Sequence, residues 1–158
     1  MSSSFPLTRR SALLVAASTA VFAKTPSRAA EEQMITVHKD PSCGCCSGWV
    51  RHLQQAGFLV KTIETADLEP VKTRLGVPAE LAACHTAQIG SYVIEGHVPV
   101  VALRRLLKDK PSAAGLAVPG MPIGAPGMEG GSPEPYEVVL FGPAGRSTYM
   151  RFVGDRAL

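Results

Sequence analysis

Three of the four cysteines in this chain lie within residues 43–46, in the order Cys-Gly-Cys-Cys. A short β-like run over 34–38 precedes them, and a helix is expected over 45–56, ending at Gly57. A second strand is expected over 58–64. A helical connection of this length between two strands predicts a parallel βαβ unit. The cysteines therefore lie in the turn between the first strand and the helix.

The start of a helix changes the chemistry of a thiol. Backbone N–H groups there favour negative charge, which lowers the pKa of a cysteine and raises its thiolate fraction. A thiolate is both a nucleophile and a ligand for soft metals. The turn therefore suits either metal binding or disulfide exchange, and the cysteines alone leave both functions open.

The middle of the chain extends the α/β pattern. A helix that Asp67 can cap is expected over 67–76, followed by one further helical turn over 78–82. A hairpin with a tight turn is expected over 86–89 and 92–95, and an amphipathic helix over 100–108. The order is then βαβαββα. With a Cys-x-x-Cys pair after the first strand, this order resembles the glutaredoxin-like members of the thioredoxin superfamily.

One segment departs from that superfamily. Where its members usually have a cis-proline facing the Cys-x-x-Cys turn, this chain has Cys84-His85-Thr86-Ala87 and no proline. A thiol and an imidazole are then expected to face the three cysteines. This substitution weakens the prediction of a simple oxidoreductase and favours a metal site.

The C-terminal part of the chain begins with a Gly- and Pro-rich segment. Residues 111–135 show no periodicity, and a loop this long in a small domain is usually functional or disordered. Runs over 137–141 and 146–152 predict a closing hairpin. The expected fold class is α/β, thioredoxin-like, with a C-terminal Gly/Pro/Met loop and β-hairpin.

Soft donors indicate the metal. Thiolates and thioethers select Cu(I), with zinc as the competitor for thiolates, and thioethers bind zinc poorly. Methionines in a polar loop therefore favour copper. The candidate ligands are Cys43, Cys45, Cys46, Cys84, His85, Met121 and Met128.

Each candidate also has a simpler interpretation. Cys43 and Cys46 can form a structural disulfide, Cys45 can point away from the turn, and Cys84 can be a small buried apolar residue. His85 can hydrogen-bond locally, and both methionines can pack over the core.

The other three histidines are weaker candidates. His97 follows a glycine at a strand end and is expected to be structural or exposed rather than a ligand. His38 lies near the end of the first strand and can approach the site. His52 is expected on the surface of its helix.

Residues 1–30 have the pattern of a removable export signal. Arg9 and Arg10 precede a short apolar run over 11–23, as in twin-arginine signals, and small residues suitable for cleavage follow. The run is too short to span a bilayer. The alternatives are a disordered tail or an interfacial anchor. The expected organisation is a signal over 1–30 and one metal-binding domain over 31–158, located in the periplasm.

The charge of the chain depends on that signal. It contains four of the 16 basic residues and no acidic one, so residues 31–158 have 12 basic and 13 acidic residues and a net charge of −1, against +3 for the whole chain. We find no basic patch interleaved with aromatic residues, which argues against nucleic-acid binding. No other stretch is apolar enough to span a membrane. The clustered cysteines also argue against a disulfide framework.

Five separated motifs together resemble the CopG-type copper-resistance proteins, long described as a domain of unknown function. The motifs lie at 43–46, 84–87, 95–99, 115–122 and 126–130. The resemblance extends over about Ile35 to Phe152. It implies a thioredoxin-like fold, export to the periplasm, and a role in copper resistance with copper bound by the Cys-x-Cys-Cys cysteines and neighbouring sulfur ligands. The implied partners are periplasmic copper efflux or resistance proteins. A redox role on copper has been proposed for such proteins.

Two functions are therefore expected. The first is a periplasmic Cu(I)-binding protein in copper resistance or homeostasis. The alternative is a thiol–disulfide oxidoreductase in which Cys43 is the nucleophile and Cys46 the resolving thiol. The sequence leaves open whether the chain is an enzyme acting on copper or on thiols. A structural zinc domain is a third reading, but it does not explain the methionine-containing loop.

Overall fold

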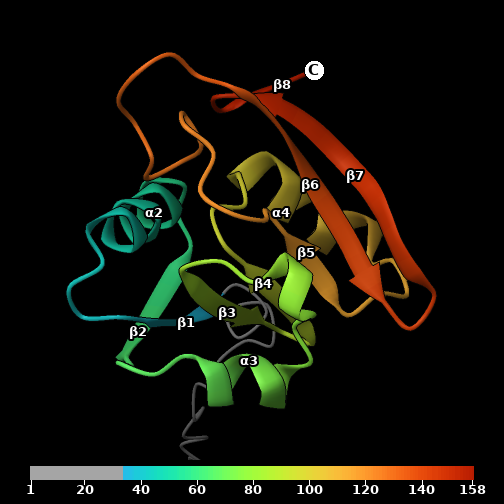
Figure 1. Cartoon of the computed structure of the whole chain (residues 1–158). Coiled ribbons are helices and arrows are strands. Elements are labelled where there is room, and N and C mark those ends of the chain that lie inside the picture. Colours follow the sequence, from blue (N-terminus) through green and yellow to red (C-terminus); the bar gives the residue numbers. More distant parts are fainter. Residues whose placement is uncertain (1–33) are drawn as a thin grey trace, which may run out of the picture.

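The computed structural model describes residues 34–158, so the export signal predicted over 1–30 lies outside the described residues. In the described part of the chain, eight strands form one mixed sheet in the order β2-β1-β3-β4-β5-β6-β7-β8 (Figure 1). The strands are β1 Met34–Lys39, β2 Leu59–Glu64, β3 His85–Ile89, β4 Tyr92–Glu95, β5 Gly115–Ala117, β6 Pro135–Gly142, β7 Gly145–Val153 and β8 Arg156–Ala157. The helices are α2 Gly44–Gln55, α3 Glu69–Leu75, the 3₁₀ turn η1 Ala79–Leu81, and α4 Val100–Asp109.

The predicted βαβ unit is confirmed. Strands β1 and β2 are parallel, with Met34 paired with Leu59, and α2 connects them. Strand β3 runs antiparallel to β1, and β4 returns antiparallel to β3 as the predicted hairpin. The predicted βαβαββα order is therefore the observed one, and the chain has a mixed α/β fold.

One element within the predicted loop was missed. Strand β5 lies inside the segment 111–135, parallel to β4 and antiparallel to β6, so it joins the C-terminal hairpin to the rest of the sheet. A Cβ on Gly115 would lie 1.8 Å from the carbonyl oxygen of Val93, so a side chain there would collide with β4. A strand of three residues is too short to show an alternating pattern, which explains why periodicity did not reveal it.

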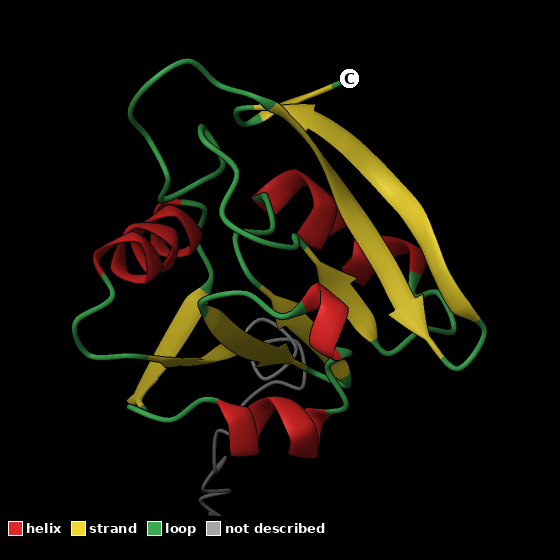
Figure 2. Ribbon diagram, viewed as in Figure 1, coloured by secondary structure: helices red, strands yellow, loops and turns green. Residues whose placement is uncertain are grey.

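The two faces of the sheet bury different side chains. Leu116 of β5 joins the main core with residues of α2 and α4, whereas its neighbour Ala117 joins a smaller cluster with Leu81 of η1. This alternation is what a strand covered on both faces requires. Figure 2 shows α2 and α4 on one side of the sheet and α3 on the other.

The main core has one polar contact that fixes α2. Trp49 is fully buried, and its indole N–H donates to the carbonyl oxygen of Val98 at 2.9 Å. A buried indole that lacked this acceptor would cost free energy. The contact therefore ties the helix that bears the cysteines to the segment that leads into α4.

The first turn of α3 differs slightly from the prediction. The helix begins at Glu69, and Leu68 rather than Asp67 occupies the cap position. The Asp67 carboxylate still accepts the N–H of Glu69 at 3.1 Å. Asp67 therefore still accepts a backbone N–H at the start of the helix, although it lies one residue before the cap position.

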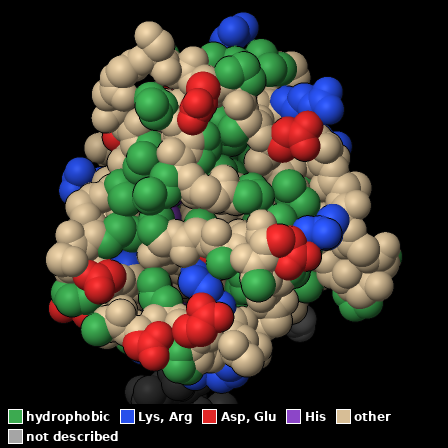
Figure 3. Space-filling model, in the orientation of Figure 1, with side chains coloured by type: hydrophobic (Ala, Val, Ile, Leu, Met, Phe, Trp, Pro, Cys, Tyr) green, Lys and Arg blue, Asp and Glu red, His purple; other side chains and the backbone are tan. Residues whose placement is uncertain are grey.

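The surface is mixed in charge on the face shown in Figure 3, where acidic and basic side chains alternate with apolar ones. Within residues 34–158 no helix has the length and hydropathy needed to cross a bilayer.

Candidate metal centre

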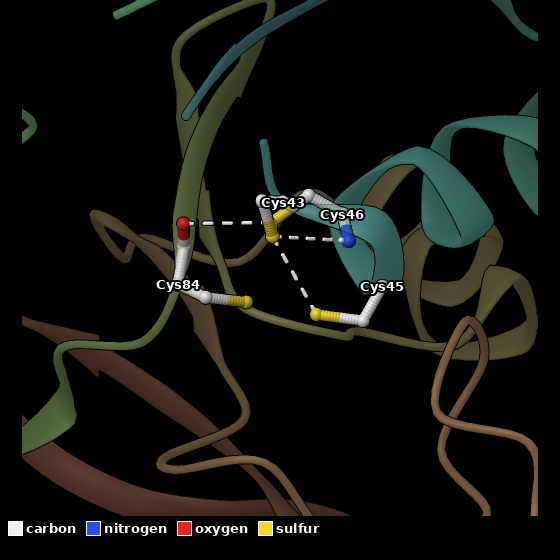
Figure 4. Close-up of side chains that lie close together, drawn as sticks. All are labelled: Cys43, Cys45, Cys46 and Cys84. Carbon is white, nitrogen blue, oxygen red and sulfur yellow. Dashed lines mark hydrogen bonds between the residues drawn. A yellow bond between two sulfur atoms is a disulfide. The ribbon is translucent and has the colours of Figure 1, made fainter. Parts of the chain in front are cut away.

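Four cysteine side chains from two distant segments converge at one point. The sulfurs of Cys43, Cys45, Cys46 and Cys84 all lie within 4.8 Å of one another. Three belong to the cap and first turn of α2, and Cys84 immediately precedes β3 (Figure 4). Antiparallel pairing of Lys39 with His85 places the end of β1 beside the start of β3. The turn after β1 and the residue before β3 therefore meet at the same edge of the sheet.

Two of the four sulfurs are bonded to each other. Cys43 and Cys46 form a disulfide with a Cα–Cα distance of 5.4 Å, and Cys45 and Cys84 are free. The disulfide that the sequence analysis kept as the simpler interpretation is thus present in this structure. Cys43 and Cys46 become thiolate ligands only after two-electron reduction, because the metal ligand is the thiolate.

Cys45 faces the cluster instead of pointing away from it. Its sulfur lies 3.5 Å from that of Cys43. The alternative in which Cys45 is only an outward helix residue is therefore wrong for this structure.

Cys84 is a half-buried thiol with a strongly altered acidity. Burial, together with the neighbouring Cys45 sulfur, raises the pKa of Cys84 to about 12. Its carbonyl oxygen lies 3.6 Å from the sulfur of Cys46. Cys84 is therefore protonated at neutral pH, and a metal ion that binds it must displace the proton.

His97, a weak candidate from the sequence, lies beside Cys84 in the structure. It is fully buried, and its Nε2 lies 3.1 Å from the sulfur of Cys84. Its Nδ1–H donates to the carbonyl oxygen of Pro126 at 2.8 Å. Because a carbonyl only accepts, the proton lies on Nδ1 and the Nε2 lone pair faces Cys84.

A signal for His97 existed in the hairpin register. The pairing of Thr86 with Glu95, continued two residues beyond the hairpin, places Cys84 opposite His97. Of the two expectations for His97, structural or exposed, exposure is excluded because the side chain is fully buried.

His85 lies at the same point, between two rings. Its Nδ1 is 3.4 Å from the sulfur of Cys84, and its ring centroid is 4.4 Å from that of Trp49 and 4.9 Å from that of His97. Burial, with the electrostatic influence of the neighbouring His97 next, holds the pKa of His85 well below its ordinary value. The ring is therefore neutral, which is the form that binds metals. Its Nε2 has no hydrogen-bond partner within the described residues.

The remaining histidines lie apart from this point. Neither His38 nor His52 belongs to a group of potential metal ligands in the described part of the chain. His38 is buried on β1. His52 is half-buried instead of lying freely on the surface, and its Nε2 accepts the N–H of Val100 at 3.4 Å.

The methionine-containing loop touches the cysteine helix through its backbone. A Cβ on Gly127 would lie 2.5 Å from the carbonyl oxygen of Cys45 and 2.6 Å from the nitrogen of Trp49. The next residue, Met128, is partly buried and packs against the main core, whereas Met121 is 56% exposed. Packing over the core, the simpler interpretation, thus describes Met128. Copper ligation by either thioether stays a prediction.

A buried ion pair supports the segment that ends at Cys84. Lys72 donates to Thr86 Oγ1 at 2.9 Å and to the fully buried carboxylate of Glu95. The same carboxylate accepts the Thr86 hydroxyl at 2.7 Å and the backbone N–H of Ala83 at 2.6 Å. Glu95 therefore fixes the backbone immediately before Cys84. Local sequence patterns do not reveal this pair, because its partners come from α3, β3 and β4.

Two overlapping donor sets result, and they share Cys84. One consists of the four sulfurs, and the other consists of Cys84, His85 and His97, whose ligand atoms also lie within 4.8 Å of one another. Thiolates suit Cu(I) and zinc, and imidazole suits divalent copper and zinc. The donors present therefore fit a soft or borderline metal ion.

Comparisons with known proteins agree with this chemistry. Residues 81–128 match the family described as "Protein of unknown function, DUF411". Two solved structures named "Copper resistance protein copG" are each 42% identical to the chain, with a TM-score of 0.71. The one called Form 2 is matched over 75% of this chain and 97% of its own length, and Form 1 over 77% and 98%. No curated protein matches the chain.

Proposed function

This chain belongs to the family of CopG copper resistance proteins, and we propose that it is a periplasmic protein that binds Cu(I) through its cysteine cluster. The observation that supports this function is the convergence of four sulfurs within 4.8 Å. Thiolates bind both Cu(I) and zinc, and the methionines of the C-terminal loop favour Cu(I) because thioethers bind zinc poorly. Clustered thiolates can also bridge ions, so the cluster has the donors for more than one copper ion.

We further propose that the fold is of the thioredoxin type. The parallel β1-α2-β2 unit, followed by an antiparallel β3-β4 hairpin and α4, supports this assignment. The disulfide at the start of α2 lies where thioredoxin-like proteins place their Cys-x-x-Cys pair. Disulfides persist in oxidising compartments, which agrees with the export signal predicted over 1–30.

Binding of Cu(I) at the full cluster requires the reduced protein. A dithiol reductant supplies the two electrons and two protons, becomes a disulfide itself, and converts the Cys43–Cys46 disulfide into two thiols. Copper then displaces protons from the thiols, including that of Cys84, whose pKa is raised. His85, Met121 and Met128 are the proposed additional ligands, and zinc is the expected competitor. Copper efflux or resistance proteins are the proposed partners.

The direct test is anaerobic titration of the reduced chain, residues 31–158, with Cu(I) in the presence of a competing Cu(I) chelator. We expect more than one tightly bound Cu(I) per chain and weaker binding of zinc. Cys43→Ser and Cys84→Ser should each lower the number of copper ions held. A reduced, folded protein that loses all Cu(I) to the chelator would refute the proposal.

The alternative function, thiol–disulfide exchange, is favoured by one observation. Cys46 is fully buried, whereas Cys43 at the start of α2 is partly exposed, as expected for a resolving and an attacking thiol. An insulin-reduction assay tests it directly. Turnover that disappears in Cys43→Ser would support this alternative, and no turnover by the wild-type protein would exclude it for that class of substrate.

A further inference from the structure

We propose that Cys84, His85 and His97 form a second metal site, which binds one divalent ion of borderline softness while the Cys43–Cys46 disulfide is closed. In a copper resistance protein the ion we expect is Cu(II). The inference rests on the proposed function for the identity of the metal, but it concerns a different oxidation state of the protein and an overlapping set of ligands to which His97 is new.

The geometry around the sulfur of Cys84 is the first argument. The Nε2 of His97 lies 3.1 Å from it and the Nδ1 of His85 lies 3.4 Å from it, on two buried rings set edge to face. The three ligand atoms fall within 4.8 Å of one another. Small shifts of these side chains are enough to surround one ion.

The orientation of His97 is the second argument. Metal-binding histidines usually donate their other ring N–H to a backbone carbonyl or a carboxylate, which fixes the ring and its tautomer. The Nδ1–H of His97 donates in this way to Pro126 at 2.8 Å. The loop that supplies this carbonyl is held on α2 by Gly127. The Nε2 lone pair of His97 is therefore oriented toward Cys84 before any metal arrives.

The chemistry of the donors is the third argument. Closing the disulfide removes two of the four soft sulfurs, Cys43 and Cys46, because a disulfide sulfur is no longer a thiolate. It removes none of the three donors around Cys84. One thiolate with two imidazoles is a set that binds divalent copper and zinc. The oxidised protein therefore keeps a site for a divalent ion after losing two of its four cysteine ligands for Cu(I). Binding of the ion releases the thiol proton of Cys84 to solvent.

Co(II) is the probe for this site, because it binds where Zn(II) or Cu(II) binds and does not oxidise thiols. The test uses residues 31–158 with the disulfide closed, verified by counting the two free thiols. We expect about one Co(II) per chain, a near-ultraviolet thiolate-to-metal band, and intense visible bands of four-coordinate Co(II). Co(II) binding that reaches saturation without the near-ultraviolet thiolate-to-metal band would overturn the proposal.

Variants of the two free cysteines locate the thiolate. Cys84→Ser should lose the thiolate band, and the matched variant Cys45→Ser should keep it. The reverse result would assign the thiolate to Cys45 and contradict the proposal.

Histidine variants locate the nitrogen ligands. His97→Gln retains an N–H that can donate to Pro126 but removes the imidazole, and it should weaken Co(II) binding at least roughly tenfold. His52→Gln, a matched change at a histidine outside the cluster, should not alter it. If His97→Gln does not fold, the ¹⁵N shifts of the wild-type ring decide: Zn(II) should move the Nε2 resonance of His97 strongly, and an unmoved resonance would overturn the assignment.

Failure of this inference is distinguishable from failure of the proposed function. A reduced protein that takes up Cu(I), with a disulfide form that ignores Co(II), refutes only the second site. A reduced protein that takes up no Cu(I), with a disulfide form that binds Co(II), refutes the proposed function and supports the second site.

Discussion

Gly48 of α2 and Gly127 of the C-terminal loop lie in direct backbone contact. A Cβ on Gly48 would lie 2.8 Å from the Cα of Gly127, and Gly127 itself has a φ of +87°. The contact holds the loop that supplies the Pro126 carbonyl to His97 against the helix that bears three cysteines. Two glycines far apart in the chain thus align the two halves of the candidate metal centre.

Substitution of Gly127 by Ala should destabilise the protein. The new methyl group would collide with the backbone of Cys45 and Trp49, and an L side chain is strained at this φ. We expect a loss of about 2 kcal/mol or more in the free energy of unfolding, measured by urea denaturation. Gly120→Ala is the matched control, since it has a φ of +71° but open space around it. Equal losses in both variants would show that the contact of Gly127 with α2 contributes nothing to the free energy of unfolding.

The buried pair of Lys72 and Glu95 should show strong coupling. Glu95→Gln leaves the ammonium group of Lys72 without a countercharge in a site where its side chain is only 8% exposed. The expected loss is about 3–5 kcal/mol in the free energy of unfolding. The double variant Lys72→Met/Glu95→Gln should recover much of it, because it removes both charges and keeps an oxygen that can accept the N–H of Ala83. A double variant as unstable as the sum of the single variants would contradict the coupling.

The β6-β7 hairpin should lose a stabilising contact in acid. Hydrogen bonds from Thr148 and then from Arg151 lower the pKa of Glu137 from its ordinary value of 4.5. A carboxylate whose pKa is lowered by folding stabilises the protein above the unfolded pKa, and this contribution disappears as the pH falls through the lower folded pKa. The melting temperatures of wild type and Glu137→Gln should therefore differ most near neutral pH and converge in acid. A constant difference down to pH 2 would contradict this contribution.

Metal binding should quench the fluorescence of the chain. Trp49 is the only tryptophan, and its ring centroid lies 4.4 Å from that of His85. Open-shell ions such as Co(II) or Cu(II) quench a nearby indole, whereas closed-shell Zn(II) bound at the same place is the control. We expect quenching that saturates at the binding stoichiometry. Stoichiometric binding of Co(II) with unchanged emission would place the ion elsewhere.

The two methionines should contribute unequally to Cu(I) binding. Met128 follows the glycine that contacts α2, whereas Met121 is 56% exposed. Met128→Leu preserves volume and packing but removes the thioether, and we expect it to weaken Cu(I) binding roughly tenfold, equivalent to about 1.4 kcal/mol. Met121→Leu is the matched control, with a smaller expected effect. Competition with a Cu(I) chelator measures both, and unchanged affinity in Met128→Leu would leave this residue only its packing role.

Local pattern was enough for much of the fold. Strand, helix and hairpin signals around residues 43–46 and 86–95 predicted the βαβ unit and the order of elements up to α4, and the runs over 137–141 and 146–152 predicted the closing hairpin. The antiparallel β3-β4 pairing even places Cys84 opposite His97 when its register is extended. Local pattern missed β5, which lies in the glycine-rich segment, because a strand of three residues is too short to show a period.

The donors that the chain possesses, and the position of three of them at the start of a helix, follow from local sequence. Which of these donors meet depends on how the whole domain folds. Pairing of β1 with β3 brings Cys84 to the helix that bears the other cysteines, and the hairpin places the ring of His97 beside Cys84. The contact of Gly127 with α2 positions the Pro126 carbonyl, which orients the ring of His97. The physical reason is that the chemistry of a side chain is a property of its own atoms, whereas a metal site depends on distances between atoms far apart in the chain. Those distances are set by strand pairing, backbone contact and burial of the whole domain.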